Sequence, residues 1–393
     1  MLPPERLDAV HTVKPEACRK CGDSLSGDDN DPHRHQVVEI PRLVARGVEY
    51  QLHALRCTRC HITTRATLPE GVPSAMVGPR LQAMAAVCAG AYRLSKRMIE
   101  EMLSDFLDVD ISLGSICNLE QRTSEAVAPA VAEAIAAVQR APVKHADETS
   151  WREAKQKAWL WVAATSTVAV FLIRRSRGSR VARELLGDVF QGILNSDRWS
   201  GYNWINTSRR QLCWAHLKRH WKAFEDHGPE AKRIAKGLQE ATHALFGHWY
   251  RARDGTVKWS SFREYARPLQ REIIGLLREG QNCPSKKVAG MCREILTLEG
   301  ALWTFVRRAD VDPTNNAAER AIRHAVIWRK ISLGTDSEQG SRFVERMLTV
   351  VQTLRMQRRN ILDFVTESCE AAIHNVPGPS LLPAMSTDQS LAA

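Results

Sequence analysis

The spacing of apolar residues changes several times along this chain. Between residues 76 and 140 it is helical, and Ser95 and Ser112 precede two of the predicted helices as N-caps. From Ala141 the spacing becomes that of β-strands, and over 217–312 it is helical again. Further helices are predicted over 341–375. A disordered tail is predicted over 377–393.

The segments after Ala141 follow an informative order. VKHADET, KAWLWVAAT and VAVFLIRR predict three strands, SRVARELLGDVF a helix, and GILNSDRW and RRQLCWAH two more strands. The second and third strands are close enough to pair as a hairpin. A helical insertion at about 217–312 and a further helix follow. This is the order of a ribonuclease H-like domain, a mixed sheet flanked by helices, so we predict a mixed α/β fold with such a core over 141–340.

Three carboxylates lie where this fold would bring them to one edge. Asp147 is on the first strand, Asp197 lies just past the fourth, and Glu319 is in the helix after the insertion. Two-metal phosphoryl transfer needs such a cluster, because several carboxylates must hold two hard cations roughly 3.5–4 Å apart. One cation activates the attacking oxygen and the other stabilises the leaving oxygen. The pattern therefore predicts a metal-dependent phosphoryl-transfer site.

Each of these acids also has a purely structural interpretation. Asp147 could be a solvated residue at a strand end, and Asp197 lies among turn-forming residues. Glu319 could close a capping box with Asn316 as the N-cap, or pair with Arg323 one turn later. The joint placement of the three acids on the predicted elements favours the metal site.

Two Cys-x2-Cys pairs near the start of the chain predict a structural metal site. They can supply four thiolates to one tetrahedral zinc ion, each pair forming a knuckle: Cys18, Cys21, Cys57 and Cys60. Between the pairs, the run from Gln36 to Leu55 alternates with period two and has a plausible turn at Arg46-Gly47, which predicts a hairpin. We expect a zinc ribbon over 15–65, in which the metal stabilises a domain with little core of its own.

A second short motif, Cys213-x2-His216, follows the fifth predicted strand. One cysteine and one histidine cannot complete a zinc site. A packing role at the start of the inserted helices is therefore favoured over a contribution to the active-site edge.

Charge and composition narrow the class of partner. The 393 residues include 55 Lys and Arg against 44 Asp and Glu, a formal charge of +11. This surplus favours a polyanionic partner, although simple solubility would also explain it. The first twenty residues contain no apolar core, and the longest apolar run, WLWVAATSTVAVFLI, is too short for a membrane span. These features, with ten cysteines, predict a protein of the reducing cytoplasm without a membrane partner.

Several long motifs closely resemble bacterial insertion-sequence DDE transposases of the family numbered sixty-six: HADETSW, NSDRWSGYNW, RQLCWAHLKRHW and the segment from DPTNNAAER to NILDF. The resemblance covers about 141–375, and CRKCG…RCTRC is similar to the family's zinc-binding domain. It implies that two magnesium ions are bound by the catalytic acids Asp147, Asp197 and Glu319. Similar transposases often carry a coiled coil ahead of the zinc domain, whereas 17 residues precede Cys18 here, as expected of a shorter branch or a truncated copy.

The reaction implied by this resemblance is hydrolysis of a phosphodiester at a transposon end, after which the freed 3′ hydroxyl attacks target DNA. The expected partners are transposon-end DNA and target DNA, with a homo-oligomer assembled on the DNA at the nucleoid and accessory transposition proteins as further candidates. The helical segment 76–140 has a helix–turn–helix outline and is expected to bind DNA. Two alternatives remain, a catalytically inert zinc-dependent DNA-binding regulator derived from a transposase and a stand-alone nuclease.

Basic residues on the helix of Glu319 are candidates for contacts to DNA phosphates, because the guanidinium group is forked and permanently charged. A solvated helix face with local ion pairs explains them equally well, except at the two arginines that flank Glu319. The candidates are Arg320, Arg323, Arg329 and Lys330.

Overall fold

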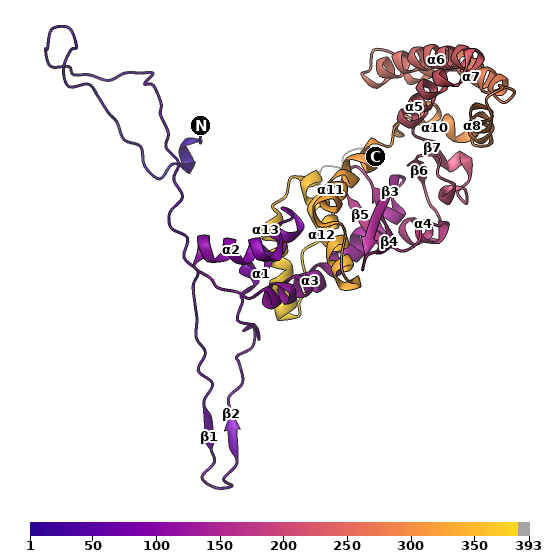
Figure 1. Ribbon diagram of the computed structural model, residues 1–393. Coiled ribbons are helices and arrows are strands. Elements are labelled where there is room, and N and C mark those ends of the chain that lie inside the picture. The colour runs from indigo at the N-terminus through magenta and orange to yellow at the C-terminus, as the bar shows by residue number, and fades with distance from the viewer. Residues whose placement is uncertain (384–393) are drawn as a thin grey trace, which may run out of the picture.

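The computed structural model describes residues 1–383 and has a mixed α/β architecture (Figure 1). Its main sheet has five strands in the order β5-β4-β3-β6-β7. The central strand β3 pairs antiparallel with β4 and parallel with β6. Each of the five strands overlaps a segment predicted from the sequence, although β3 runs four residues further and β4 begins one residue earlier than predicted: β3 Val143–Glu153, β4 Gln156–Ala164, β5 Ala169–Arg174, β6 Ile193–Ser196 and β7 Arg210–Leu212.

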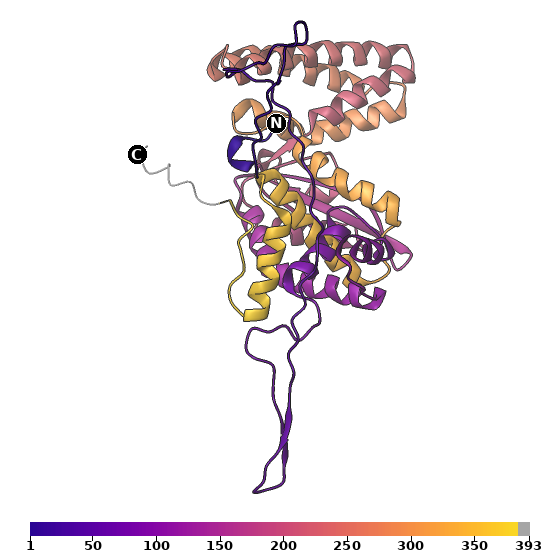
Figure 2. The same ribbon diagram turned by 90° about the vertical axis from the view of Figure 1, so that its left-hand side faces the viewer.

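Two hydrophobic clusters support different parts of this sheet. The first joins β3, β4 and β5 to helices from both ends of the chain: α1 Pro79–Gly90, α2 Lys96–Leu107, α3 Leu113–Arg140, α4 Ser179–Leu186, α11 Asn316–Ser332, α12 Glu338–Gln357 and α13 Ile361–His374. The second joins β6 and β7 to the predicted helical insertion: α5 Trp214–Phe224, α6 Pro229–Arg253, α7 Trp259–Gly280, α8 Lys286–Thr297, α9 Glu299–Leu302 and α10 Thr304–Arg307. In both views the long helices of the insertion extend from one end of the body (Figures 1 and 2). No helix within residues 1–383 is long and apolar enough to cross a membrane.

The two predicted N-caps are confirmed. Ser95 accepts a hydrogen bond from the backbone N–H of Met98 at the start of α2, and Ser112 accepts one from Ser115 at the start of α3. These bonds satisfy backbone donors that have no partner inside the helix. α3 extends further than the pattern predicted and reaches Arg140, where it leads into β3.

Helix α12 runs along β5, the edge strand of the sheet. Thr353, Thr349 and Glu345 accept hydrogen bonds from the backbone N–H groups of alternate residues of β5: Ala169, Phe171 and Ile173. Four residues of a helix rise about 6 Å and two residues of a strand about 6.7 Å. The side chains at every fourth position of α12 therefore have nearly the same spacing as the N–H groups of alternate residues of β5. The helix thereby satisfies donors that an open edge would leave unpaired.

The N-terminal segment, residues 1–70, contains no buried residue. Its antiparallel pair is formed by β1 Ala54–Arg56 and β2 Thr63–Arg65 around the second cysteine pair. The hairpin predicted over Gln36–Leu55 with a turn at Arg46-Gly47 is wrong, since residues 36–53 adopt no strand. A two-stranded ribbon that nothing covers gains too little from burial to be stable by itself. The observed β1–β2 turn is held in addition by the backbone hydrogen bonds of the second cysteine knuckle.

Part of the predicted disordered tail packs on the body. Leu381 is fully buried, and its carbonyl oxygen accepts a hydrogen bond from Gln357 at 2.8 Å. The carbonyl of Ser380 accepts one from Arg359 at 2.9 Å. The prediction was therefore wrong for residues 377–383, because these contacts with the end of α12 could not be read from local composition. Residues 384–393 lie outside the described part of the chain.

Candidate active site

The register of the sheet brings the first two acids level with each other. His145 on β3 pairs with Asn195 on the parallel strand β6. Two residues further on come Asp147, on β3, and Asp197, just past the end of β6. Asp197 also begins a turn, because its Oδ1 accepts a hydrogen bond from the backbone N–H of Trp199 at 2.8 Å.

The third acid is positioned by the start of α11. The side chain of Asn315 donates to the carbonyl of Ala146 on β3 at 2.8 Å, and its backbone N–H donates to Cys213 Sγ at 3.1 Å. Asn195 of β6 donates to the carbonyl of Thr314 at 3.0 Å. These bonds tie the N-terminus of α11 to both strands that carry the acids, so Glu319 faces the same region one turn into the helix.

The capping interpretation of Glu319 does not describe the structure. The N-cap is Asn315, not Asn316, and its side chain makes no capping hydrogen bond. The Oε1 of Glu319 instead lies 3.9 Å from Cys213 Sγ and 3.5 Å from His216 Nδ1. Among the ion pairs of residues 1–383 there is none between Glu319 and Arg323.

The three acids lie within one another's electrostatic field. The pKa of Asp147 is raised to about 7, mainly by burial and further by the negative charges of Glu148, Asp197 and Glu319, while one backbone hydrogen bond opposes the rise. In the described residues no Lys or Arg side chain forms an ion pair with Asp147, Asp197 or Glu319. The site is therefore a partly buried concentration of negative charge with no direct Lys or Arg ion pair, and the nearby buried guanidinium of Arg210 bonds to the carbonyl of Asp197 at 3.2 Å and not to its carboxylate.

Glu148 is a supporting residue that the sequence analysis did not select. Its side chain is 1% exposed, accepts hydrogen bonds from Arg177 at 2.8 and 3.0 Å, and accepts one from the Tyr202 hydroxyl at 2.8 Å. Arg177 in turn stacks over the rings of Trp159 and Trp199. This network ties the turn after Asp197 to β3. Neighbouring residues of a strand point to opposite faces of the sheet, so Glu148 must face away from Asp147. Because helices were predicted on both faces, the sequence could have indicated that Glu148 is buried.

Cys213 and His216 lie both in the packing contact at the start of the insertion and next to Glu319. They begin α5, where Cys213 is buried and bonded to the start of α11. Together with Glu319 they form the one group of three metal-capable side chains found within residues 1–383, with ligand atoms all within 4.8 Å of one another. Burial lowers the pKa of His216 and raises that of Cys213. The motif therefore packs the insertion against α11 and also borders the acids.

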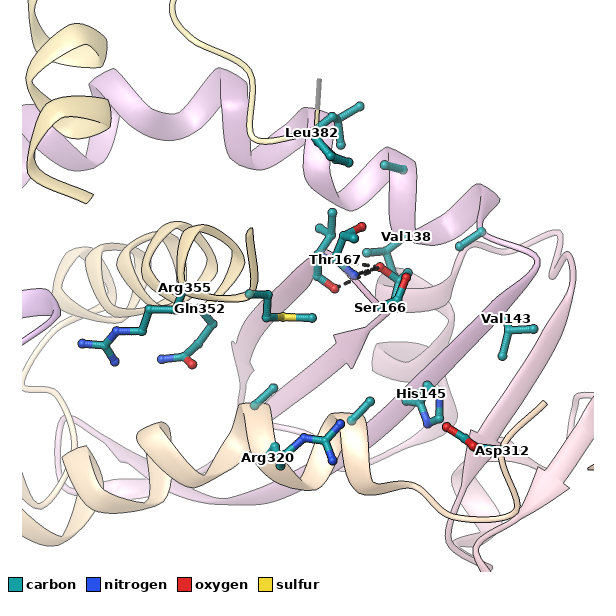
Figure 3. Close-up of a pocket in the computed structure, with 18 of the residues that line it drawn as sticks. Val138, Val143, His145, Ser166, Thr167, Asp312, Arg320, Gln352, Arg355 and Leu382 are labelled. Carbon is teal, nitrogen blue, oxygen red and sulfur yellow. Dashed lines mark hydrogen bonds between the residues drawn. The ribbon is translucent and has the colours of Figure 1, made fainter. Parts of the chain in front are cut away.

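The four basic candidates have different surroundings. Arg320 lines a large cavity together with His145 of β3 (Figure 3). Arg323 and Lys330 are exposed. Arg329 is directed to β3, where its guanidinium donates to the Thr149 hydroxyl at 2.9 Å and to the Ser150 carbonyl at 2.7 Å.

The two cysteine pairs form separate but matching knuckles. In each, the first cysteine's N–H donates to the carbonyl five residues on and its carbonyl accepts from the N–H four residues on. Backbone hydrogen bonds from the following residues lower the pKa of Cys18 and of Cys57. The segment before residue 36 loops out on the opposite side from the β1–β2 hairpin (Figure 1), closed by hydrogen bonds between Leu2 and Gln36. No four-cysteine cluster is therefore assembled in the described residues.

Comparison with known proteins identifies the family of this chain. The family model described as "Transposase IS66 family" matches residues 74–343, well over half of the chain, and the chain belongs to that family. Two relatives come from Sinorhizobium fredii (strain NBRC 101917 / NGR234). The chain is similar to "Uncharacterized protein y4qI", 27% identical over 54% of this chain and 43% of the relative. It is also similar to "Uncharacterized protein y4hP", 23% identical over 87% of this chain and 68% of the relative.

Proposed function

We propose that this transposase-family chain catalyses metal-dependent cleavage of DNA at transposon ends and transfer of the freed strand into target DNA. The observation that carries the proposal is the acid cluster, in which Asp147, Asp197 and Glu319 come from three parts of the fold and, within residues 1–383, form no ion pair with Lys or Arg. The strand order, with β3 antiparallel to β4 and parallel to β6, supports a ribonuclease H-like core. The residues matched by the family model include all three acids.

The donor set fits magnesium. Carboxylate oxygens are the ligands that hard divalent cations prefer, and a buried negative cluster is stable only if a cation or protons compensate it. The pKa of Asp147 is raised to about 7 because, without a bound cation, a proton partly compensates the negative charge of the cluster. We therefore assign Asp147, Asp197 and Glu319 as the residues that would hold two magnesium ions.

The protein groups have distinct roles in this scheme. Bound divalent ions would supply the positive charge that activates the attacking oxygen and stabilises the leaving oxygen. The acids fix that charge on the rigid sheet and on α11, while Asn315 and Glu148 hold the elements that carry them. Arg320 and Arg323 flank Glu319 and would contact the DNA backbone, with Lys330 further along the exposed face. Arg329 would act mainly by fastening α11 to β3.

The test is a cleavage and strand-transfer assay with the element's own terminal DNA and magnesium. Asp147→Asn and Asp197→Asn should each abolish both products while keeping the melting temperature, because an uncharged amide is a poor ligand for a hard cation. Glu338→Gln, an exposed acid in the first turn of α12, is the matched control and should remain active. Cleavage without transfer in the wild type would instead indicate a stand-alone nuclease. An Asp147→Asn variant as active as the wild type would defeat the assignment.

We also propose that the two cysteine knuckles bind structural zinc, as a zinc-binding domain ahead of the catalytic core. The matched backbone geometry and the lowered pKa values of Cys18 and Cys57 favour thiolates, which are the form that binds zinc. Closure of one site by four cysteines requires the two knuckles to come together. Metal analysis should give about one zinc per chain, lost in the Cys18→Ser/Cys57→Ser variant. Unchanged zinc in that variant would refute the site.

A further inference from the structure

Three side chains with different donor atoms converge where the helical insertion begins. Cys213 is the N-cap of α5 and His216 is its third residue, and a hydrogen bond from the His216 N–H to the Cys213 carbonyl at 3.1 Å closes the turn between them. Glu319 approaches them from the first turn of α11. A thiol, an imidazole and a carboxylate from two separate helices thus form one cluster, with ligand atoms within 4.8 Å of one another.

The contacts inside this cluster are not those of a closed hydrogen-bond network. Oε1 of Glu319 lies 3.5 Å from Nδ1 of His216, yet Nδ1 is buried and makes no hydrogen bond within residues 1–383. The same oxygen lies 3.9 Å from Cys213 Sγ, a long contact even for a thiol. Buried polar atoms are nearly always paired in native proteins. A cation between the three donors would satisfy them together.

The distances between the donor atoms fit a tetrahedral zinc ion. Zinc binds sulfur at about 2.3 Å, nitrogen at about 2.0–2.1 Å and carboxylate oxygen at about 2.0–2.2 Å. Tetrahedral angles then place nitrogen and oxygen about 3.4 Å apart, and sulfur about 3.6 Å from either of them. The observed N···O and S···O distances, 3.5 and 3.9 Å, are only slightly longer. The ion would touch all three atoms from inside the cluster, so their small exposure to solvent does not hinder it.

The surroundings of Cys213 favour the thiolate that a metal requires. The residue is 1% exposed, and its Sγ accepts a hydrogen bond from the backbone N–H of Asn315 at 3.1 Å. A hydrogen bond donated to sulfur stabilises the negatively charged form. Asn315 therefore supports Cys213 as a metal ligand.

The charges around the cluster are compatible with a bound cation. Near His216, the acids Asp197 and Glu319 offset Arg198 and Arg219, and the guanidinium of Arg198 is already paired with another carboxylate. Within residues 1–383 no Lys or Arg pairs with Glu319. A metal ion would supply the counter-charge that this carboxylate lacks.

The donor set selects the class of metal. Thiolate and imidazole bind zinc and similar transition metals, whereas magnesium prefers oxygen ligands. Cys213 and His216 are therefore unsuited to the magnesium ions proposed for the acids. A carboxylate has two oxygens, so Glu319 can bind one ion through Oε1 and another through Oε2. Three protein ligands leave the fourth tetrahedral position of zinc for water.

We propose that Cys213, His216 and Glu319 form a binding site for one zinc ion, which fastens the start of the insertion to α11. The site goes beyond the proposed function, since it involves neither the cysteine knuckles nor magnesium-dependent cleavage. Zinc should bind here more weakly than to four thiolates, because there is one protein ligand fewer and a buried thiol must lose its proton. The zinc retained through purification is accordingly expected at the knuckles, and this site is filled by added metal.

The experiment is a cobalt titration of the full chain in which the four knuckle cysteines are replaced by serine. These replacements lie within residues 1–70, which contain no buried residue, so the core should stay folded. Cobalt(II) binds where zinc does and absorbs visible light, and a bound thiolate adds a charge-transfer band in the near ultraviolet. The test variants in this parent chain are Cys213→Ser and His216→Gln. The matched controls are Cys117→Ser and His243→Gln, at exposed residues outside the cluster.

The parent chain should bind one equivalent of cobalt with the spectrum of a four-coordinate ion that has a thiolate ligand. Zinc should abolish this spectrum, and an excess of magnesium should not. Cys213→Ser should remove the near-ultraviolet band. His216→Gln should weaken cobalt binding by about a hundredfold, since even the loss of a residue that only orients a metal ligand costs roughly 10–100-fold. Both controls should keep the spectrum and the affinity of the parent.

A second measurement tests the link between the two helices. Zinc should raise the melting temperature of the parent chain, because a ligand that binds only the folded state stabilises it. The rise should be absent in His216→Gln. An equal rise in that variant would mean that zinc stabilises the chain at another place.

Three spectroscopic outcomes would overturn the site. No thiolate band in the parent would show that the cluster binds no transition metal. A band that survives Cys213→Ser would place the metal at another cysteine. Undiminished cobalt affinity in His216→Gln would refute the site even if Cys213→Ser did not fold. These spectra do not depend on DNA cleavage, so an inactive chain that binds cobalt would refute only the proposed function, and an active chain without the band only this site.

Discussion

The N-terminal segment and the α/β core both have apolar residues spaced as in β-strands, but only those of the core are buried in a sheet. In the segment, apolar residues such as Val37, Val38 and Val48 are at least 71% exposed. In the core, apolar residues of β4 and β5 are almost entirely buried. Both regions alternate or cluster their apolar residues as strands do.

The difference shows that a strand pattern becomes a strand only when a second layer covers it. β4 and β5 are covered by α4, α11 and α12, which bury their side chains and pair the edge. Residues 36–53 have no such layer, so their pattern has no core to join. A bound metal is the remaining means by which so small a region gains stability.

The largest effect should follow from a change at the core's acid cluster. Glu319→Gln should lower cleavage and joining by roughly a thousandfold or more, since it removes a charge needed for several kcal/mol of transition-state stabilisation. Its melting temperature and binding of terminal DNA should stay near wild type, because Glu319 does not cap α11. Parallel activity, binding and thermal measurements check this. If the variant still cleaves, Glu319 is not a metal ligand and the third acid is another residue.

A change at the sealed edge of the sheet should be the next largest. Glu345 is buried and accepts from the Ile173 N–H, and it pairs with Arg174 and Arg342. Glu345→Ala should lower the free energy of unfolding by about 3–5 kcal/mol, because it leaves those groups unpaired. Urea denaturation measures the loss.

The matched change in the N-terminal segment is Glu49→Ala, at an exposed acid bonded only to Gln51. It should alter the free energy of unfolding by no more than about 0.5 kcal/mol. Equal losses in the two variants would remove the distinction between the regions.

Metal binding should depend on pH differently in the two regions. With a pKa of about 7, Asp147 is largely protonated at pH 6, and a divalent cation must displace that proton. Magnesium affinity should therefore rise about fivefold from pH 6 to 7, about tenfold in all by pH 8, and level off above that. Calorimetric titrations at several pH values test this, and Asp147→Asn should flatten the profile.

Zinc binding by the cysteine knuckles should depend less on pH. Their lowered thiol pKa values should keep zinc binding less sensitive to pH above 7 than it is for an unstructured Cys-x2-Cys peptide. A steeper profile than the peptide's would contradict the role of the backbone hydrogen bonds.

The smallest effect should come from removing the N-terminal segment. Deletion of residues 1–70 takes away no buried side chain, so the core's melting temperature should change by less than about 2 °C. Differential scanning calorimetry measures it. A drop of 10 °C would show that the segment supports the core through contacts beyond those described.

Much of this protein was determined by local sequence. Alternation and helical spacing predicted all five strands of the main sheet, and Ser95 and Ser112 marked two helix starts, because N-cap chemistry and burial periodicity act within a few residues. The same order of elements indicated where Asp147, Asp197 and Glu319 would lie. Their roles remain proposals.

Tertiary structure decided what depends on residues far apart in the chain. Glu148 meets Tyr202 across 54 positions, Thr349 meets Phe171 across 178, and the cavity closes only when α3 and α12 reach the same end of the sheet. The failed hairpin at 36–55 and the packed residues 377–383 have the same cause. Whether a segment is buried depends on which element, distant in the sequence, packs against it. The local pattern of apolar residues does not contain that information.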